Sequence, residues 1–133
     1  MLAANASGLR KLYAHVRAGK GAGVLPDQQP SQGEGRFAPF FGIPALTAVL
    51  SPRLIKATGC NVLLCVCERL PRGRYRVHIL PPDDAVYSGD LDEALAGVNR
   101  SVEYCIAIDP AQYLWSYKRF RARPEGAPPF YDE

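Results

Sequence analysis

Histidine is scarce in this sequence, which limits the chemistry that the chain can perform with its own side chains. Only His15 and His78 occur among the 133 residues. Imidazole is the side chain used most often for proton transfer in enzymes. Acid–base catalysis must therefore use one of these two residues, another side chain, or a residue outside this chain. A GxSxG motif is also missing, which argues against a serine nucleophile held on a strand-to-helix turn.

The sequence also lacks a long apolar run. Its longest uncharged stretch, residues 37–52, is interrupted by Pro39, Pro44 and Pro52. It is shorter than the roughly 20 apolar residues that a membrane-spanning helix needs. The first residues have neither the basic start nor the apolar middle of a secretory signal. We therefore expect no membrane span and no export signal.

Neither charge nor cysteine content marks a specialised class of protein. The 16 Lys and Arg against 13 Asp and Glu leave a net charge of +3, too small for bulk charge to indicate a dedicated nucleic-acid binder. Four cysteines without an export signal predict reduced, mostly buried thiols. Their spacing offers no CxxC pair, so we expect no metal site, and we expect no cofactor. These cysteines are Cys60, Cys65, Cys67 and Cys105.

The remaining composition favours one compact domain. A chain of 133 residues with 47% hydrophobic residues can fill one core and is too short for two ordinary domains. We expect residues 1–133 to form a single domain, with residues 124–133 as an extended tail.

Apolar periodicity predicts helices in several places. The most secure is an amphipathic helix over residues 91–106, where Asp90 and Glu93 resemble a capping box. Asp109 and Pro110 are expected to cap a last helix. The other predicted helices cover residues 7–18, 45–50 and 51–58, the last kinked or separated at Pro52, and Gly59 is expected to end it.

The predicted strands are short. Residues 23–25 read as a buried strand leading to Asp27, and residues 61–67 as a central strand apolar on both faces. A turn at 71–73 joins the latter to a strand over 75–79 with one wet face. Residues 28–42 read as an irregular loop carrying Phe side chains. The expected fold is therefore α/β with three strands, part of a larger sheet with flanking helices.

Two motifs suggest chemistry that their context does not support. Residues 19–23 are glycine-rich, but they close a helix and open a strand, the reverse of a phosphate-binding loop. His78 and Asp83 have the His-x4-Asp spacing of many acyltransferases. His78, however, lies on the arginine-bearing face of its strand, and two prolines lead Asp83 away from it. We interpret this spacing as a coincidence.

Basic residues interleave with aromatic ones near the end of the chain. This pattern occurs in proteins that stack single-stranded nucleic acid and in proteins that lie at a membrane surface. It is equally consistent with aromatic side chains that simply fill the core. The residues concerned are Tyr113, Trp115, Tyr117, Lys118, Arg119, Phe120, Arg121 and Arg123.

Several separated blocks, taken in order, resemble one known family. They are Leu25-Pro26-Asp27-Gln28, the Phe-rich block 37–45, the aliphatic stretch after Gly59, Leu80-Pro81-Pro82, and the aromatic and basic block 110–126. Together they are similar to the C-terminal half of the lipid A biosynthesis lauroyl/myristoyl acyltransferases. One departure is Tyr117, where the family usually has His ahead of its basic pair.

The resemblance implies a bacterial enzyme at the cytoplasmic face of the inner membrane that moves a fatty acyl chain from acyl carrier protein to a hydroxyl of a lipid A precursor. It implies part of a glycerolipid-acyltransferase-like sheet. The family's N-terminal membrane helix and its His-x4-Asp/Glu motif have no counterpart before Asp27. We therefore expect the catalytic dyad upstream of this chain, which should be inactive alone.

The resemblance also suggests roles for individual residues. Those expected to bind substrate are Asp27, Gln28, Arg36, Lys118 and Arg119, the cations because they suit phosphate oxygens or the acidic carrier protein. Those expected to line the acyl path or touch the membrane are Phe37, Phe40, Phe41 and Trp115. The alternative function is a non-catalytic basic module that binds anionic lipid or nucleic acid, although for the acyltransferase no nucleic-acid partner is expected.

Overall fold

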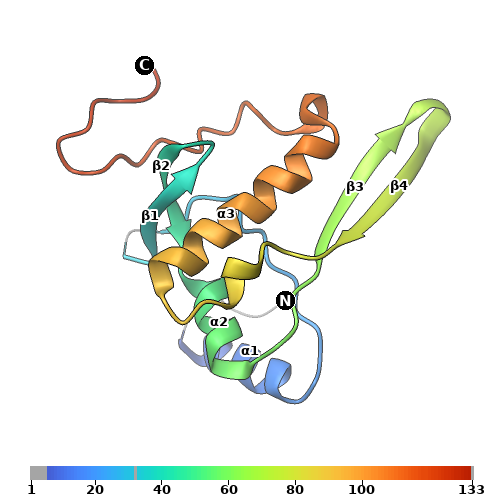
Figure 1. The fold of residues 1–133 in the computed structure, drawn as a ribbon, viewed down its shortest axis with the longest axis vertical. Helices are drawn as coiled ribbons and strands as arrows, with labels where there is room; N and C mark the ends of the chain where they lie inside the picture. The colour runs from blue at the N-terminus through green and yellow to red at the C-terminus, as the bar shows by residue number, and fades with distance from the viewer. Residues whose placement is uncertain (1–5, 32, 133) are drawn as a thin grey trace.

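The computed structural model describes residues 6–31 and 33–132, and this part of the chain folds into three α-helices and two β-hairpins. In Figure 1, α3 runs through the body, β1 and β2 lie against it, and the β3–β4 hairpin projects away from the body. The order is α1 (Ala6–Arg17), β1 (Gly35–Phe40), β2 (Ile43–Ala48), α2 (Leu50–Thr58), β3 (Leu64–Leu70), β4 (Arg74–Leu80) and α3 (Leu91–Ile108). The fold is thus mixed α and β, with two separate two-stranded sheets instead of one three-stranded sheet.

The apolar stripe of α3 organises the core. Leu95, which is fully buried, packs against Ala38 and Val49, and Val102 and Ile106 pack against Phe40 and Ala45. The helix begins as its capping residues predict, because the Asp90 carboxylate accepts the Glu93 backbone N–H at 2.8 Å. The prediction of this helix is confirmed, as is that of α1.

The β1–β2 hairpin differs from the sequence prediction of a loop over 37–42 and a helix over 45–50, and both predictions are wrong. Pro39 and Pro44 face one another in the antiparallel register. A two-stranded sheet leaves each strand an outer edge on which a missing N–H costs no ladder bond, so proline is tolerated there. Phe41 and Gly42 form the turn, both with positive φ (48° and 74°).

The prediction for α2 is confirmed at its end and corrected at its start. Gly59 adopts the left-handed conformation, and its N–H donates to the Ile55 carbonyl at 2.8 Å. Pro52 lies in the first turn, where it removes no helical hydrogen bond, so the helix is not divided there.

The β3–β4 hairpin forms where the sequence predicts it, but its side chains are not buried in the predicted pattern. Side chains alternate along β3, so Leu64, Val66 and Glu68 are half-buried while the intervening residues are exposed. Two-sided burial and buried thiols are therefore wrong for this strand. On β4, the apolar side chains are exposed to solvent. The exposed apolar face consists of Cys65, Cys67, Tyr75, Val77 and Ile79.

Two further predictions fail where a segment has no strand or helix partner. Residues 23–25 are irregular, and Leu25 is 73% exposed. The predicted helix over 110–120 is only a short 3-10 turn, Pro110–Gln112, although Asp109 caps it as expected. Beyond it the backbone turns so that Arg119, 3% exposed, reaches the interior. The following segment has no helix or strand, and Phe130 packs against Phe120.

Candidate functional site

A groove with a cavity of about 340 Å³ runs between three parts of the chain. One wall is the irregular segment 24–27, the opposite wall is β3 with the residues before it, and α3 forms the floor. The lining is mostly apolar. Its charged residues are all acidic: Asp27, Glu68 and Asp109. A groove of this kind suits an extended apolar group with a polar or cationic end.

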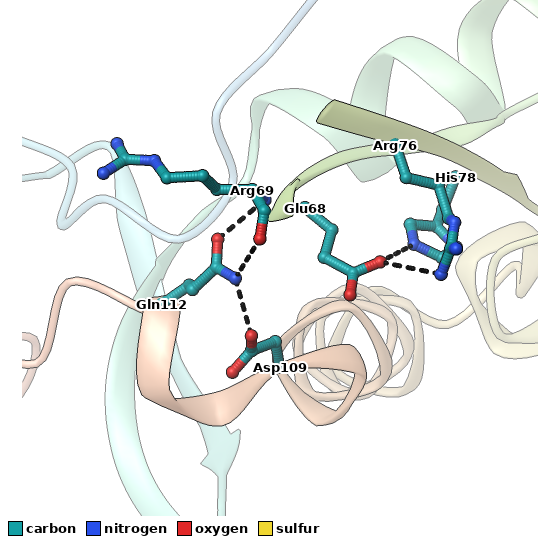
Figure 2. A network of polar contacts seen from close by, with 6 residues as sticks. All are labelled: Glu68, Arg69, Arg76, His78, Asp109 and Gln112. Carbon is teal, nitrogen blue, oxygen red and sulfur yellow. Dashed lines mark hydrogen bonds and ion pairs between the residues drawn. The ribbon is translucent and has the colours of Figure 1, made fainter. Parts of the chain in front are cut away.

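The outer edge of β3 opens onto this groove. At one end of the edge, the Gln112 side chain donates to the Arg69 carbonyl at 2.9 Å and accepts the Arg69 N–H at 2.8 Å, as Figure 2 shows. The Gln112 amide also donates to Asp109 at 2.6 Å. Because backbone groups in an antiparallel pair point alternately toward and away from the partner strand, those of Cys65 and Cys67 share the outward direction of Arg69.

Asp27, Tyr113 and Arg119 form a polar cluster at one end of the groove. Tyr113 Oη and Arg119 Nε are buried without a hydrogen-bond partner in the described part of the chain. Burial raises the pKa of Tyr113, with a further contribution from Asp27, and burial lowers the pKa of Arg119. The arginine donates to the Leu46 carbonyl at 2.6 Å and to Thr47 Oγ1 at 3.2 Å.

The His78–Asp83 spacing does not correspond to a pair in space. His78 Nε2 lies 2.8 Å from Glu68 Oε2, and Arg76 reaches the same oxygen at 3.4 Å (Figure 2). Asp83 instead binds the Arg100 guanidinium through both of its oxygens at 2.8 Å. His78 and Asp83 thus bond different partners, which agrees with the interpretation of the spacing as a coincidence.

The structure separates the residues predicted to bind substrate. Asp27 lines the groove, whereas Gln28 is exposed and does not line it. Arg36 pairs with Asp92 at 2.9 Å on the surface, and Lys118 lies over the Tyr131 ring at 5.7 Å. Arg119 is interior, within the cluster described above. Of these five residues, only Asp27 lines the groove, and Arg119 lies in the interior, where it interacts electrostatically with Tyr113 and Asp27.

The aromatic residues predicted for the acyl path or the membrane also divide into two sets. Phe40 is 2% exposed and belongs to the core. Phe37, Phe41 and Trp115 are exposed, and the rings of Phe41 and Trp115 lie 6.2 Å apart. These two rings give the molecule an exposed aromatic patch near the β1–β2 turn.

All four thiols are free, and three of them line the groove. Cys65 and Cys67 are exposed, while burial and the neighbouring Cys65 raise the pKa of Cys105. A raised pKa keeps the Cys105 thiol protonated near neutral pH and so weakly nucleophilic. In the described ranges no group of three potential ligands could hold a metal ion.

Sequence reasoning assigned no site role to Glu68 or Gln112, and it named Tyr113 only as part of the basic and aromatic pattern near the end of the chain. Glu68 is the one acidic residue within β3, and opposes Arg76 across the hairpin. The alternation of side chains along the two strands places Glu68 opposite Arg76, and this pattern could have identified Glu68 from the sequence. Gln112 follows an Asp-Pro cap, but its bond to β3 joins segments 43 residues apart in sequence, which no local pattern indicates.

The chain matches the family model for bacterial lipid A biosynthesis acyltransferases over residues 1–122, and it belongs to that family. It is 30% identical over 125 residues to the lipid A biosynthesis lauroyltransferase of Escherichia coli (strain K12), covering 92% of this chain and 41% of that protein. It is 28% identical over 125 residues to the palmitoleoyltransferase of the same organism, covering 92% and 40%. A lipid A biosynthesis acyltransferase of Haemophilus influenzae is 26% identical over 128 residues, covering 92% and 38%.

These comparisons confirm the resemblance to the lipid A biosynthesis acyltransferases. The chain spans about two-fifths of the length of the relatives it matches. In the described residues no helix is long and apolar enough to cross a membrane.

Proposed function

We propose that this chain forms one wall of the active site of a lipid A acyltransferase, which moves a fatty acyl chain from acyl carrier protein to a hydroxyl of a lipid A precursor. The observation that carries the proposal is the family match over residues 1–122. The site of the whole enzyme lies at the cytoplasmic face of the inner membrane in this proposal, where both substrates meet.

The reaction needs a base beside the acceptor hydroxyl. The hydroxyl oxygen attacks the thioester carbonyl carbon, a C–O bond forms and the C–S bond breaks. The hydroxyl proton passes to the base and then to the leaving thiolate. In this chain neither imidazole lines the groove, because His78 pairs with Glu68, and His15 contacts the Gly21 carbonyl at 3.1 Å. In this proposal neither His15 nor His78 supplies the imidazole of the dyad that the family resemblance implies.

In this proposal, the residues of this chain bind the substrates and hold them in position. Asp27 orients the donor or the dyad's surroundings at the end of the groove, and Gln28 lies next to it. Arg36 and Lys118 are exposed cations that hold phosphates or the acidic carrier protein. Arg119 is a positioning residue, because it touches Leu46 and Thr47 and none of the solvent-facing surface. Phe37, Phe41 and Trp115 contact the acyl chain or the bilayer edge, and Phe40 supports them from the core.

A chimera tests the proposal directly. In the Escherichia coli lauroyltransferase, the matched segment is replaced by residues 1–122 of this chain, and lauroyl transfer from acyl carrier protein to a lipid A precursor is measured. We expect transfer above the vector control, and a loss of about tenfold or more with Asp27→Asn.

The matched control is Asp84→Asn, an exposed carboxylate outside the groove, which should leave the transfer rate unchanged. A folded chimera without any transfer would contradict the proposed function. Equal rates for the Asp27 and Asp84 variants would contradict the role of Asp27 alone.

A further inference from the structure

The segment that carries Asp27 has no helix or strand of its own. Residues 24–27 are irregular, and Asp27 lies in a turn that belongs to neither hairpin. Its carboxylate nevertheless lines the groove, and burial together with the charge of Asp27 raises the pKa of Tyr113. A side chain on an irregular segment keeps one position only where other parts of the chain hold that segment. Contacts from elsewhere must therefore fix this turn.

Gln29, two residues after Asp27, is held by the C-terminal segment at two points. Its backbone N–H donates to Tyr117 Oη at 2.7 Å. Its side-chain Oε1 accepts the Ala122 N–H at 3.1 Å. Both bonds are partly buried, and they join residues 88 and 93 positions apart in the sequence. Because consecutive Cα atoms are only about 3.8 Å apart, an anchor two residues away restricts where Asp27 can lie.

Tyr117 is itself fixed to the core through its neighbour Arg119. The Arg119 backbone N–H donates to the Tyr117 carbonyl at 2.8 Å. The Arg119 guanidinium is buried and donates to the Leu46 carbonyl and to Thr47 Oγ1, both in β2. A continuous series of contacts therefore leads from β2 through Arg119 and Tyr117 to Gln29.

We propose that Tyr117 and Gln29 are positioning residues that hold Asp27 at the groove by joining its turn to the C-terminal segment. The Tyr117 hydroxyl oxygen is the acceptor, so removal of that one oxygen breaks the first bond and leaves the packing of the ring. The Gln29 side chain supplies a second bond. The contribution of Asp27 to acyl transfer belongs to the proposed function, on which this inference rests.

Order parameters from NMR relaxation of the 133-residue chain measure the hold on Asp27 without any activity. We expect the Asp27 amide to have a rigid value of about 0.85 in the unaltered chain and a value of about 0.6 or below in Tyr117→Phe. Hydrogen exchange at the Gln29 amide should accelerate about tenfold, because its acceptor is lost. Gln29→Met, which keeps the length of the side chain but removes its acceptor oxygen, should also lower the order parameter of Asp27.

Tyr87→Phe is the matched control. Tyr87 Oη accepts the Val62 N–H at 3.0 Å, a bond of the same kind that lies outside both the Asp27 turn and the C-terminal segment. Tyr87→Phe should leave the order parameter of Asp27 and the exchange of the Gln29 amide unchanged.

The chimera tests whether Tyr117 acts through Asp27. We expect Tyr117→Phe to lower lauroyl transfer by about threefold or more, as expected for the loss of one hydrogen bond. The double variant with Asp27→Asn should be no slower than Asp27→Asn alone, because the carboxylate that Tyr117 positions is then absent. A role of Tyr117 in stability alone would instead multiply the two losses.

Two results would overturn the proposal. One is an order parameter at Asp27 that Tyr117→Phe and Gln29→Met both leave unchanged. The other is a double variant slower than Asp27→Asn by the full factor measured for Tyr117→Phe. Absence of transfer in every chimera would contradict the proposed function instead, and the order parameters would still decide whether the turn is held.

Discussion

At the scale of single residues, the polar groups of this protein serve two different purposes. Thr47 and Asn99 are fully buried and bond one another, and Arg119 joins them from the C-terminal segment. The hydrogen bonds of this network link β2, α3 and the last segment within the core. Tyr113 Oη and Arg119 Nε, by contrast, are buried without a hydrogen-bond partner among the described residues.

Asp83 gives the clearest prediction of pH dependence. Its hydrogen bonds to Arg100 lower its pKa from the ordinary 3.8 to about 2. A carboxyl group with a lowered folded pKa stabilises the fold above its ordinary pKa and loses that contribution as the pH falls through the folded value. The stabilisation should therefore be complete above about pH 4 and disappear toward about pH 2.

The measurement is the free energy of unfolding in urea for the unaltered chain and Asp83→Asn at pH 7 and pH 2.5. We expect the variant to lose roughly 1–2 kcal/mol at pH 7, reduced by screening of the half-exposed Arg100, and much less at pH 2.5. Asp84→Asn, which changes an exposed neighbour, should cost under about 0.5 kcal/mol at both values. An equal loss for Asp83→Asn at the two pH values would contradict the role of its charge.

At the scale of elements, those with strong local signals were predictable. The helix α3 combines an Asp cap with an apolar stripe, and both depend only on neighbouring residues. The β1–β2 hairpin was missed because its proline and phenylalanine content is typical of a loop, and its stability depends on α3, which lies far along the sequence. Residues 23–25 have the composition of a buried strand, but no partner strand pairs with them in the described chain.

Close packing between α3 and the short 3-10 turn Asp84–Tyr87 depends on Gly97. A Cβ at this position would lie 2.7 Å from Val86 N and 2.8 Å from the Ala85 carbonyl carbon, both backbone atoms that cannot turn aside. Gly97→Ala should therefore destabilise the protein by about 1–3 kcal/mol, although the same change usually stabilises a helix. Thermal unfolding measures the effect. Gly89→Ala is the control, since a Cβ there meets nothing within 4 Å, and a comparable loss in both variants would contradict the packing argument.

The β1–β2 turn holds an exposed aromatic residue in a costly conformation. Phe41 has φ 48° and is 47% exposed, and its ring lies beside Trp115. Asparagine adopts a positive φ at a cost about 1 kcal/mol lower than phenylalanine does. This gain offsets the stabilisation lost with the aromatic contacts of Phe41. Phe41→Asn should thus leave the free energy of unfolding within about 1 kcal/mol of the unaltered chain. Keeping Phe there is consistent with contact to the acyl chain or the bilayer.

The corresponding functional measurement is sedimentation with phosphatidylglycerol vesicles. We expect Phe41→Asn to bind about tenfold more weakly, since one inserted aromatic side chain contributes on the order of 1.4 kcal/mol. Tyr75→Ser on the β3–β4 hairpin removes a similarly exposed ring and should not change binding. Equal binding by Phe41→Asn and the unaltered chain would exclude the turn as the contact.

At the scale of the whole molecule, the described residues form two separate hairpins, and an open groove lies between β3, residues 24–27 and α3. The sequence predicted the family and the mixture of helices and strands. It did not predict that β3 would expose one face and one edge, because a strand's apolar residues do not reveal whether their partners lie in the same chain. Gln112, which ends that edge, is likewise a long-range contact.

In the proposed function, neither His15 nor His78 is the base that accepts the hydroxyl proton in the acyl transfer. The most direct measurement is the release of free thiol from lauroyl acyl carrier protein by the purified chain alone, with a lipid A precursor present. We expect no release above a protein-free control. Turnover by the chain alone that is abolished by His78→Ala and retained by Asp83→Asn would contradict it.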